Sequence, residues 1–161
     1  MKPLDLLSRK PTNELASSNR KRVYSLVKRV LFVCIGNACR SPMAEGFANY
    51  YGKGWLTAYS AGSHPAGILM PNTVKAMQEK GIDISHQSSK GLSAVNLEWM
   101  DWVVILEPTV SHSIPQNFLR SRRLDWAIQD PVGQSMEVYR RIRDEIEVRV
   151  LDFVEMVRQA S

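Results

Sequence analysis

The sequence is poor in cysteine, because its 161 residues contain only Cys34 and Cys39. Two cysteines five positions apart do not form the disulfide framework of a small secreted domain. Long apolar runs are also missing, since none approaches the ~20 residues of a membrane-spanning helix. The first ten residues, MKPLDLLSRK, contain no apolar segment typical of a secretory signal. These absences argue against export and membrane insertion, and we expect a cytoplasmic protein.

Charge is distributed unevenly along the chain, whose formal net charge is +5. Residues 1–29 contain eight Lys or Arg and two acidic residues, whereas residues 30–161 contain thirteen Lys or Arg and fourteen acidic residues. The positive excess therefore belongs to a basic amino-terminal extension, residues 1–29, that precedes one domain, residues 30–161. No zinc-finger, basic-zipper or RNA-binding motif accompanies this charge, so we expect no nucleic-acid partner.

The basic extension allows two interpretations. Its Arg- and Ser-rich, acid-poor character around residues 17–22 is typical of an organelle transit peptide. Alternatively, apolar residues lie partly on one face of a helix from about residue 12 to residue 28. The sequence favours this helix or arm, which would pack on the domain or on a neighbouring chain. An oligomer formed through the extension is therefore possible.

Apolar runs of strand length alternate with segments of helical periodicity after residue 29. The runs at 30–34, 55–60, 101–106 and 124–126 predict four strands. Helical spacing predicts helices over 41–51, 71–80 and 135–158, a turn at 92–97, and a helix at 109–119 that Pro115 would interrupt. Such alternation predicts an α/β fold: a single three-layer domain with a four-stranded parallel sheet flanked by helices on both faces.

The segment after the first predicted strand contains the most informative residues. Ligands of parallel sheets bind beyond the carboxyl ends of the strands. A short glycine-containing loop that leads into a helix directs its backbone N–H groups toward one point, where the helix dipole adds positive potential. Arg40 adds two N–H donors for anionic oxygens. These features predict a cradle for a phosphate-sized oxyanion, with a binding set of Ile35, Gly36, Asn37, Ala38, Cys39 and Ser41.

Cys34 would lie at the base of this cradle, in a strongly positive field that favours the thiolate over the thiol. A thiolate that faces a bound phosphate can attack phosphorus in line, while the cradle holds the three equatorial oxygens of the transition state. Because Arg40 and the backbone amides would neutralise these oxygens, we expect neither a metal nor a cofactor. A buried, unreactive cysteine at a strand end is the alternative, and the loop around Cys34 disfavours it.

Cys34, five intervening residues and Arg40-Ser41-Pro42, directly after a strand, resemble the signature of the low-molecular-weight protein tyrosine phosphatases. Gly36-Asn37, the second cysteine of the loop, Ser60-Ala61-Gly62 and Asp130-Pro131 are also similar to family features. The resemblance spans about residues 29–158. It implies a cysteine-dependent phosphatase that hydrolyses phosphotyrosine in proteins, and aryl phosphates, through a phosphocysteine. A phosphorylated protein is therefore the expected partner.

The resemblance also implies catalytic roles. Cys34 would be the nucleophile, Arg40 would stabilise the transition state, and Ser41 would hydrogen-bond the sulfur as it leaves. Asp130 would protonate the leaving oxygen and then deprotonate water. Asp-Pro is also a frequent turn dipeptide, so Asp130 alone would not indicate catalysis.

Three further residues are implied to support the loop or protect it. Asn37 would hold the strained loop shape, and His86 resembles a family histidine that supports it. A left-handed backbone position for Asn37 and an ordinary polar turn for His86 are the open alternatives. The spacing of Cys39 suggests a disulfide with Cys34 under oxidation, which would shield the nucleophile.

Departures from the family pattern leave the substrate open. Val132 and Gly133 stand where phosphotyrosine-specific members often have aromatic residues. Bacterial relatives with a similar Asp-Pro-x-Gly sequence act on phosphoarginine but have threonine where this chain has Ala38. A protein-arginine phosphatase, or a weakly active phosphate-binding regulatory module, is therefore the alternative. Thioredoxin-coupled arsenate reductases share the loop, but their chemistry needs two more cysteines downstream, and none follows Cys39.

Overall fold

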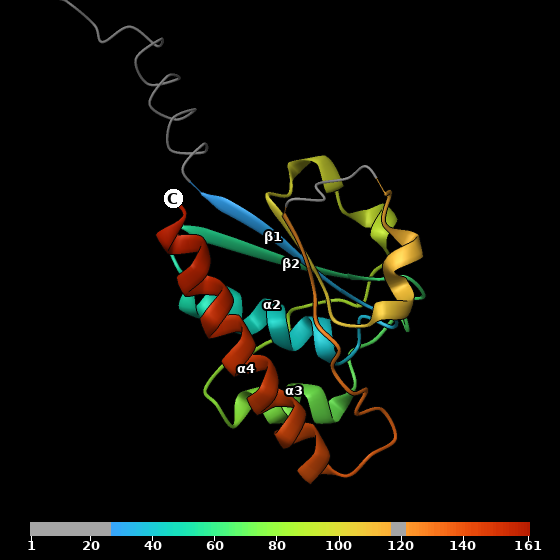
Figure 1. Cartoon of the computed structure of the whole chain (residues 1–161). Coiled ribbons are helices and arrows are strands. Elements are labelled where there is room, and N and C mark those ends of the chain that lie inside the picture. The colour runs from blue at the N-terminus through green and yellow to red at the C-terminus, as the bar shows by residue number, and fades with distance from the viewer. Residues whose placement is uncertain (1–26, 117–121) are drawn as a thin grey trace, which may run out of the picture.

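The computed structural model describes residues 27–116 and 122–161. Within them, one sheet contains β1 (Lys28–Cys34), β2 (Leu56–Gly62), β3 (Trp102–Ile105) and β4 (Arg123–Asp125). All pairings are parallel, in the order β2-β1-β3-β4. In the described residues, the connections contain two α-helices, α2 (Arg40–Tyr51) and α3 (Pro71–Gln78), and three 3-10 helices, η1 (Leu92–Ala94), η2 (Leu97–Trp99) and η3 (Pro108–Ser113) (Figure 1). The third α-helix, α4 (Met136–Gln159), follows β4. The predicted three-layer α/β fold with a four-stranded parallel sheet is confirmed.

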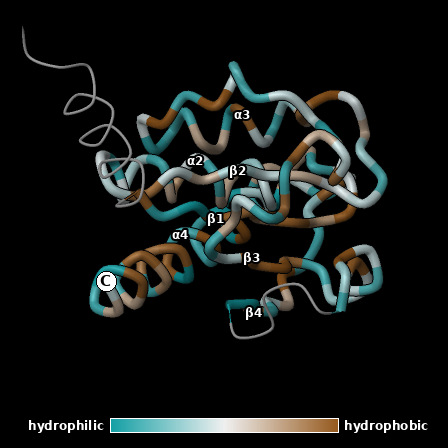
Figure 2. The backbone as a smooth tube through the Cα atoms, turned by 90° about the horizontal axis from the view of Figure 1, so that it is seen from above, coloured by the Kyte–Doolittle hydropathy of each residue, from teal (hydrophilic) through white to brown (hydrophobic). Residues whose placement is uncertain are grey.

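The two faces of β1 belong to two different apolar clusters. Val30 and Phe32 pack on one face with residues of α2, α3 and α4, and Leu31 and Val33 pack on the other. Alternate side chains of a strand point to opposite faces, and this strand is apolar at every one of these positions. Figure 2 shows β1 between β2 and β3, and the strongly hydrophobic tube of β3. In the described residues, the second face is covered by 3-10 helices rather than by α-helices.

Several boundaries differ from the prediction. β1 begins at Lys28, two residues earlier than predicted, so the last residue of the predicted helix 12–28 is in a strand. Residue 27 is in a bend, and residues 12–26 of that predicted helix lie outside the described residues. The predicted helix at 109–119 is the 3-10 helix η3, Pro108–Ser113, and its last residues also lie outside the described part. Pro115 disfavours an α-helix here because it has no N–H and its ring clashes with the preceding turn.

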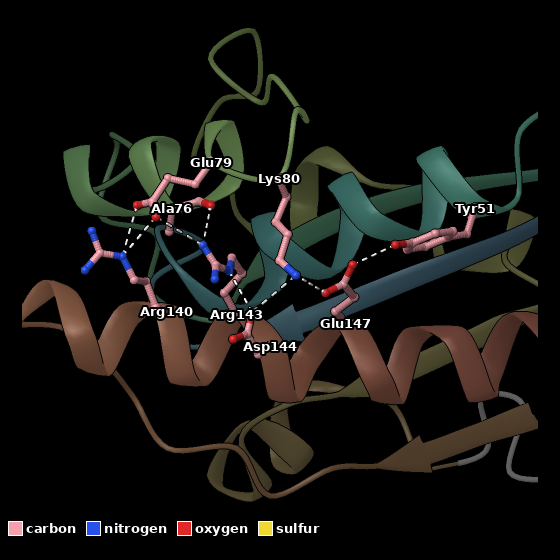
Figure 3. A network of polar contacts seen from close by, with 8 residues as sticks. All are labelled: Tyr51, Ala76, Glu79, Lys80, Arg140, Arg143, Asp144 and Glu147. Carbon is pink, nitrogen blue, oxygen red and sulfur yellow. Dashed lines mark hydrogen bonds and ion pairs between the residues drawn. The ribbon is translucent and has the colours of Figure 1, made fainter.

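A network of polar contacts fixes α3 against α4 and α2 (Figure 3). Glu147 of α4 accepts hydrogen bonds from the Tyr51 hydroxyl at 2.6 Å and forms an ion pair with Lys80 Nζ at 2.9 Å. Arg143 Nη1 donates to the Ala76 carbonyl at 3.0 Å. These contacts position α3, whose amino end lies against the loop after β1.

The carboxyl ends of the parallel strands meet at one edge of the sheet. Cys34 is in register with Gly62 of β2, and Val33 is in register with Ile105 of β3. The loops that leave these strands therefore converge there, where α/β sheets bind their ligands. No helix of the described residues is long and apolar enough to span a membrane.

Candidate active site

The loop between β1 and α2 has a constrained backbone. Asn37 has a φ of 46°, in the left-handed region that few residues other than glycine adopt. Gly62, at the end of β2, lies directly against this loop. A Cβ atom at position 62 would lie 2.4 Å from the Ile35 carbonyl oxygen and 2.9 Å from the Asn37 nitrogen. The glycine of Ser60-Ala61-Gly62 is therefore required by the close approach of β2 to the loop.

The carbonyl groups of the loop are turned outward. Those of Cys34, Ile35, Gly36 and Ala38 accept hydrogen bonds of 2.9–3.1 Å from backbone N–H groups of the 63–70 segment. The Ser89 hydroxyl also donates to the Gly36 carbonyl at 2.9 Å. In the described part of the chain, the N–H groups of residues 35–39 donate to no protein acceptor. The loop thus directs N–H donors, rather than carbonyl oxygens, toward a common centre at the start of α2.

Cys34 ends β1 at the base of this loop, and its side chain is buried. Its sulfur lies 2.9 Å from the Ser41 hydroxyl oxygen, which accepts a hydrogen bond from Asn37 Nδ2, also at 2.9 Å. The Ser41 oxygen thus accepts a proton from Asn37, and its hydroxyl group can donate its own proton to the Cys34 sulfur.

Asn37 is held in this orientation by Lys90, which the sequence did not single out, and by Ser60 of the Ser60-Ala61-Gly62 feature. Its Oδ1 accepts the Lys90 N–H at 2.9 Å, and its Nδ2 also donates to the Ser60 hydroxyl at 2.9 Å. The Ser60 hydroxyl in turn donates to the Glu45 carboxylate. Burial raises the pKa of Glu45, partly offset by this hydrogen bond and by the charges of Lys90 and His86.

His86 is exposed and makes no hydrogen bond to the loop within the described residues. It lies near Glu45, the partner of Ser60, and is thus connected to the loop only indirectly. The hydrogen bonds that support the loop come instead from Ser60, Ser89 and the Lys90 backbone.

The guanidinium of Arg40 is almost fully buried and points to the carboxyl end of β3. Its Nη1 donates to Glu107 Oε2 at 2.9 Å and to the Ile128 carbonyl at 2.8 Å. Its Nη2 lies 3.4 Å from Asp130 Oδ2. The hydrogen bond with Arg40 lowers the pKa of Glu107 despite partial burial. Sequence reasoning missed Glu107; its place directly after β3, at the ligand-binding edge, was the available signal.

Asp130 comes to the loop from the segment between β4 and α4. Its carboxylate is half-exposed, accepts the Val132 N–H at 3.1 Å and lies beside Arg40. The structure therefore gathers the three predicted catalytic residues, Cys34, Arg40 and Asp130, at one edge of the sheet. A carboxyl group beside a nucleophile and an anion cradle can exchange a proton with a leaving group or with water.

Exposed apolar side chains flank the loop. Ile35 in the loop, Ile68 in the segment that hydrogen-bonds to it, and Val132 next to Asp130-Pro131 are 37%, 63% and 47% exposed. The described residues contain no group of three His, Cys, Asp or Glu side chains that could hold a metal ion.

Arsenate reductases are among the proteins to which this chain is similar in sequence and in structure. An arsenate reductase of Brevibacillus brevis (strain 47) is 38% identical over 129 residues, which are 80% of this chain and 95% of the relative. The structure of an arsenate reductase in the phosphate binding state superimposes with a TM-score of 0.75 at 36% identity, covering 81% of this chain and 98% of that one. Similar arsenate reductases adopt reduced and oxidised states.

Phosphatase structures are equally similar in fold. The low molecular weight protein tyrosine phosphatase of T. tengcongensis gives a TM-score of 0.73 at 30% identity, covering 80% of this chain and 99% of that one. The YwlE arginine phosphatase of Geobacillus stearothermophilus gives a TM-score of 0.73 at 27% identity, covering 83% of this chain and 94% of that one. The sequence profile described as low molecular weight phosphotyrosine protein phosphatase matches residues 29–161. The chain therefore belongs to the low molecular weight phosphotyrosine protein phosphatase family.

Proposed function

We propose that this chain is a metal-independent phosphatase that hydrolyses phosphate monoesters through a phosphocysteine at Cys34. The observation that carries the proposal is the position of the Cys34 sulfur. It lies at the base of a loop whose carbonyls bond outward, and it contacts a hydroxyl that can donate to it. A regulatory module that only bound phosphate would need the cradle but not this sulfur or Asp130.

The reaction follows from these positions in two steps. The Cys34 thiolate attacks phosphorus, the bond between phosphorus and the leaving oxygen breaks, and Asp130 gives its proton to that oxygen. Asp130 then takes a proton from water, the water oxygen attacks phosphorus, and the sulfur leaves while Ser41 donates to it. Arg40 and the loop N–H groups hold the equatorial oxygens in both transition states.

Phosphotyrosine in proteins, with other aryl phosphates, is the proposed substrate class. Ile35, Ile68 and Val132 offer apolar surface on segments that flank the loop, and a phenyl ring can pack against aliphatic side chains. Phosphoarginine is the competing substrate, because the YwlE arginine phosphatase shares the fold. Hydrolysis of matched phosphotyrosine and phosphoarginine peptides distinguishes the two. A preference for phosphoarginine, whose phosphorus is bonded to nitrogen, would refute the monoester substrate but not hydrolysis through a phosphocysteine at Cys34.

The phosphatase itself is tested with an aryl phosphate in the presence of a chelator. We expect Cys34→Ser to abolish turnover and Asp130→Asn to lower kcat about 10²- to 10⁴-fold, the usual contribution of general acid–base catalysis. Asp125→Asn, which changes an exposed aspartate at the end of β4, is the matched control and should retain wild-type kcat. Substantial turnover by Cys34→Ser, or inhibition of the wild type by the chelator, contradicts the mechanism.

Arsenate reduction is the second candidate, favoured by relatives 38% identical over 80% of this chain. Cys34 would attack arsenic with loss of hydroxide. The Cys39 thiolate would then attack the Cys34 sulfur, forming a disulfide while As(V) leaves as As(III). An added dithiol would regenerate both thiols. Arsenite formation with dithiothreitol, lost in Cys39→Ser while aryl phosphate hydrolysis persists, supports this candidate. No arsenite from the wild type rejects it.

A further inference from the structure

The two edges of the sheet differ in how their backbone groups are satisfied. At the β2 edge, the Asn49 side chain of α2 accepts the Ala58 N–H at 2.8 Å and donates to the Ala58 carbonyl at 3.1 Å. The Gly62 N–H, at the end of the same strand, donates to the Lys90 carbonyl at 2.9 Å. These partners occupy backbone groups that a further strand would need, so the β2 edge is closed to strand addition.

The β4 edge is open within the described residues. β4 is the outermost strand beside β3 (Figure 2). The Trp126 N–H, directly after β4, donates to the Ile105 carbonyl of β3 at 2.6 Å. Backbone groups of successive strand residues point to alternate sides, so Leu124 also faces β3, whereas Arg123 and Asp125 direct their N–H and C=O groups away from the sheet. Among the described residues, no backbone group of another segment pairs with these outward groups.

The side chains of β4 are suited to pairing with a second copy of the same strand. Arg123 and Asp125 share one face of the strand, where Arg123 Nη2 lies 3.0 Å from Asp125 Oδ1. In an antiparallel pair centred on Leu124, each Arg123 stands opposite Asp125 of the other copy. Parallel in-register pairing, or antiparallel registers centred on Arg123 or Asp125, would oppose like charges, which destabilise a sheet. The charges therefore select one orientation and one register.

The same pairing also covers an apolar groove. A groove of about 210 Å³ lies between β4 and α4, where Leu124 and Trp126 face Phe153 and Met156. Met156 is 38% exposed. A two-fold axis at Leu124, perpendicular to the sheet, keeps both copies of α4 on one face of the joined sheet. The two Leu124 residues then form a non-hydrogen-bonded pair, in which side chains are closest, and the two grooves adjoin above them.

We propose that this chain forms a two-fold symmetric dimer in which two β4 strands pair antiparallel about Leu124 and join the sheets of both copies. In each pair of Arg123 with Asp125 of the other copy, the two residues exchange both backbone hydrogen bonds. The surface is complementary to itself, as a two-fold dimer requires. Because a three-residue strand and one groove make a small interface, we expect a transient dimer that forms at high chain concentration.

Charge reversal tests the dimer without reference to hydrolysis. In sedimentation equilibrium, the mass of wild type should rise with concentration from the monomer value of 18.3 kDa toward the dimer value. Arg123→Asp makes both outward charges of β4 negative, and Asp125→Arg makes both positive. We expect each variant alone to raise the dissociation constant at least about tenfold, because like charges then face each other at both pairs.

An equimolar mixture of the two charge variants is the decisive measurement. Opposite charges then meet at both pairs across the axis, so a mixed dimer should form with about the wild-type dissociation constant. Both variants lose the contact between Arg123 and Asp125 within their own strand, so recovery in the mixture separates pairing from folding. Lys53→Asp makes the same change of charge as Arg123→Asp next to β2, at the opposite edge, and should dimerise like wild type.

Hydrogen exchange supplies a readout that needs no variant. Protection of the Arg123 and Asp125 amides should rise with the concentration of wild type, because these N–H groups become bonded in the dimer. Thermal unfolding verifies the fold of each charge variant, and if one does not fold, the exchange measurement decides.

A wild type that stays monomeric up to about 1 mM would overturn the proposal. A dimer that Arg123→Asp and Asp125→Arg both leave unchanged would overturn it as well. Removal of residues 1–26 should leave the dimer intact. Loss of the dimer in that truncation, with wild-type association in both charge variants, would assign self-association to the basic extension and refute pairing through β4.

Discussion

Arg40 illustrates how one buried charge is shared between two carboxylates. Glu107 binds its Nη1 at 2.9 Å, and Asp130 lies 3.4 Å from its Nη2. The two carboxylates differ in exposure, with Glu107 at 21% and Asp130 at 46%. A buried guanidinium needs a permanent counter-charge, whereas a general acid must carry a proton when substrate binds. Glu107 therefore suits the permanent role and leaves Asp130 free to exchange protons.

Substitution of Glu107 by Gln tests this division. We expect kcat/KM for an aryl phosphate to fall about ten- to a hundredfold, because a misplaced Arg40 no longer matches the equatorial oxygens. Glu107→Asp keeps the charge and should recover part of the loss. Glu98→Gln, an exposed glutamate in η2, is the control and should leave kcat/KM unchanged. Wild-type kcat/KM in Glu107→Gln would contradict a role for Glu107 in orienting Arg40.

The residues of the site were predictable to different degrees. Cys34 and Arg40 could be placed from sequence because a strand, a loop and a helix start bring them together locally. Glu45 and Glu107 could not, because they reach the loop only through strand pairing and helix packing across long stretches of sequence. Ser60 was marked only by the family resemblance of Ser60-Ala61-Gly62, and its bond to Asn37 also depends on the tertiary fold. The parts of the site that neighbouring residues form can thus be predicted from the sequence, and the parts that tertiary contacts form cannot.

At the scale of elements, the approach of β2 to the loop after β1 is the tightest constraint that the described glycines show. Gly62→Ala would place a Cβ 2.4 Å from the Ile35 carbonyl oxygen, so the loop or the strand must move. We expect the free energy of unfolding to fall by about 1–3 kcal/mol, the cost of overpacking, and kcat to fall with it.

Chemical denaturation measures the stability change, with Gly36→Ala as the control. A Cβ at position 36 would meet only Ala66 Cβ at 3.8 Å and Ala38 Cβ at 4.0 Å, which are ordinary contacts. Gly36→Ala should therefore unfold close to wild type. If Gly62→Ala were as stable as Gly36→Ala, the close approach of β2 would not constrain the loop.

Elements with a continuous pattern were predicted well, and those with a mixed pattern were not. β1 and α4 were recognised because apolar residues occupy a whole strand or recur at helical spacing over 24 residues. The second face of the sheet was predicted to carry helices, but short 3-10 turns suffice to cover Leu31 and Val33. The sequence pattern does not distinguish α-helices from 3-10 turns on this face, because both bury the same apolar side chains of the sheet. Tertiary packing decides between the two.

The contacts that join α2, α3 and α4 predict a pH dependence of stability. Burial raises the pKa of Glu147, but hydrogen bonds from Tyr51 and Lys80 together outweigh it, so its pKa is lowered in the folded chain. A carboxyl group of this kind stabilises the fold fully above its unfolded pKa of about 4.3 and loses that contribution as the pH falls through its folded value.

Glu147→Gln should therefore make the free energy of unfolding depend less steeply on pH in the acid range, the acid limb of the stability curve. We expect wild type to lose unfolding free energy below about pH 4.3 more steeply than Glu147→Gln, while at neutral pH the variant is the less stable of the two. Urea denaturation at a series of pH values measures this. Glu155→Gln, an exposed glutamate of the same helix, should keep the wild-type slope. Parallel acid limbs for wild type and Glu147→Gln would contradict a stabilising role for the Glu147 contacts.

At the scale of the whole molecule, the parallel sheet separates two ends with different properties. Cys34 lies at the carboxyl end of β1 and Lys28 at the other, about 20 Å away for a strand of this length. The basic extension joins the domain at the Lys28 end. Residues 1–26 contain six Lys or Arg and two acidic residues, so they account for +4 of the net charge of +5.

Removal of residues 1–26 should therefore lower the net positive charge of the chain without changing its catalytic constants. We expect kcat and KM for a small aryl phosphate to stay within about twofold of the full chain, since a substrate at the Cys34 end lies beyond a Debye length of about 10 Å at 0.1 M salt. Retention on a cation exchanger should drop sharply, and if the extension mediates self-association, sedimentation should show a smaller species. The truncation begins at residue 27 so that the Lys28 N–H keeps its bond to the Trp55 carbonyl at 2.9 Å. A large fall in kcat, with unchanged thermal unfolding, would mean that the extension contributes to the active site and that the two ends are not independent.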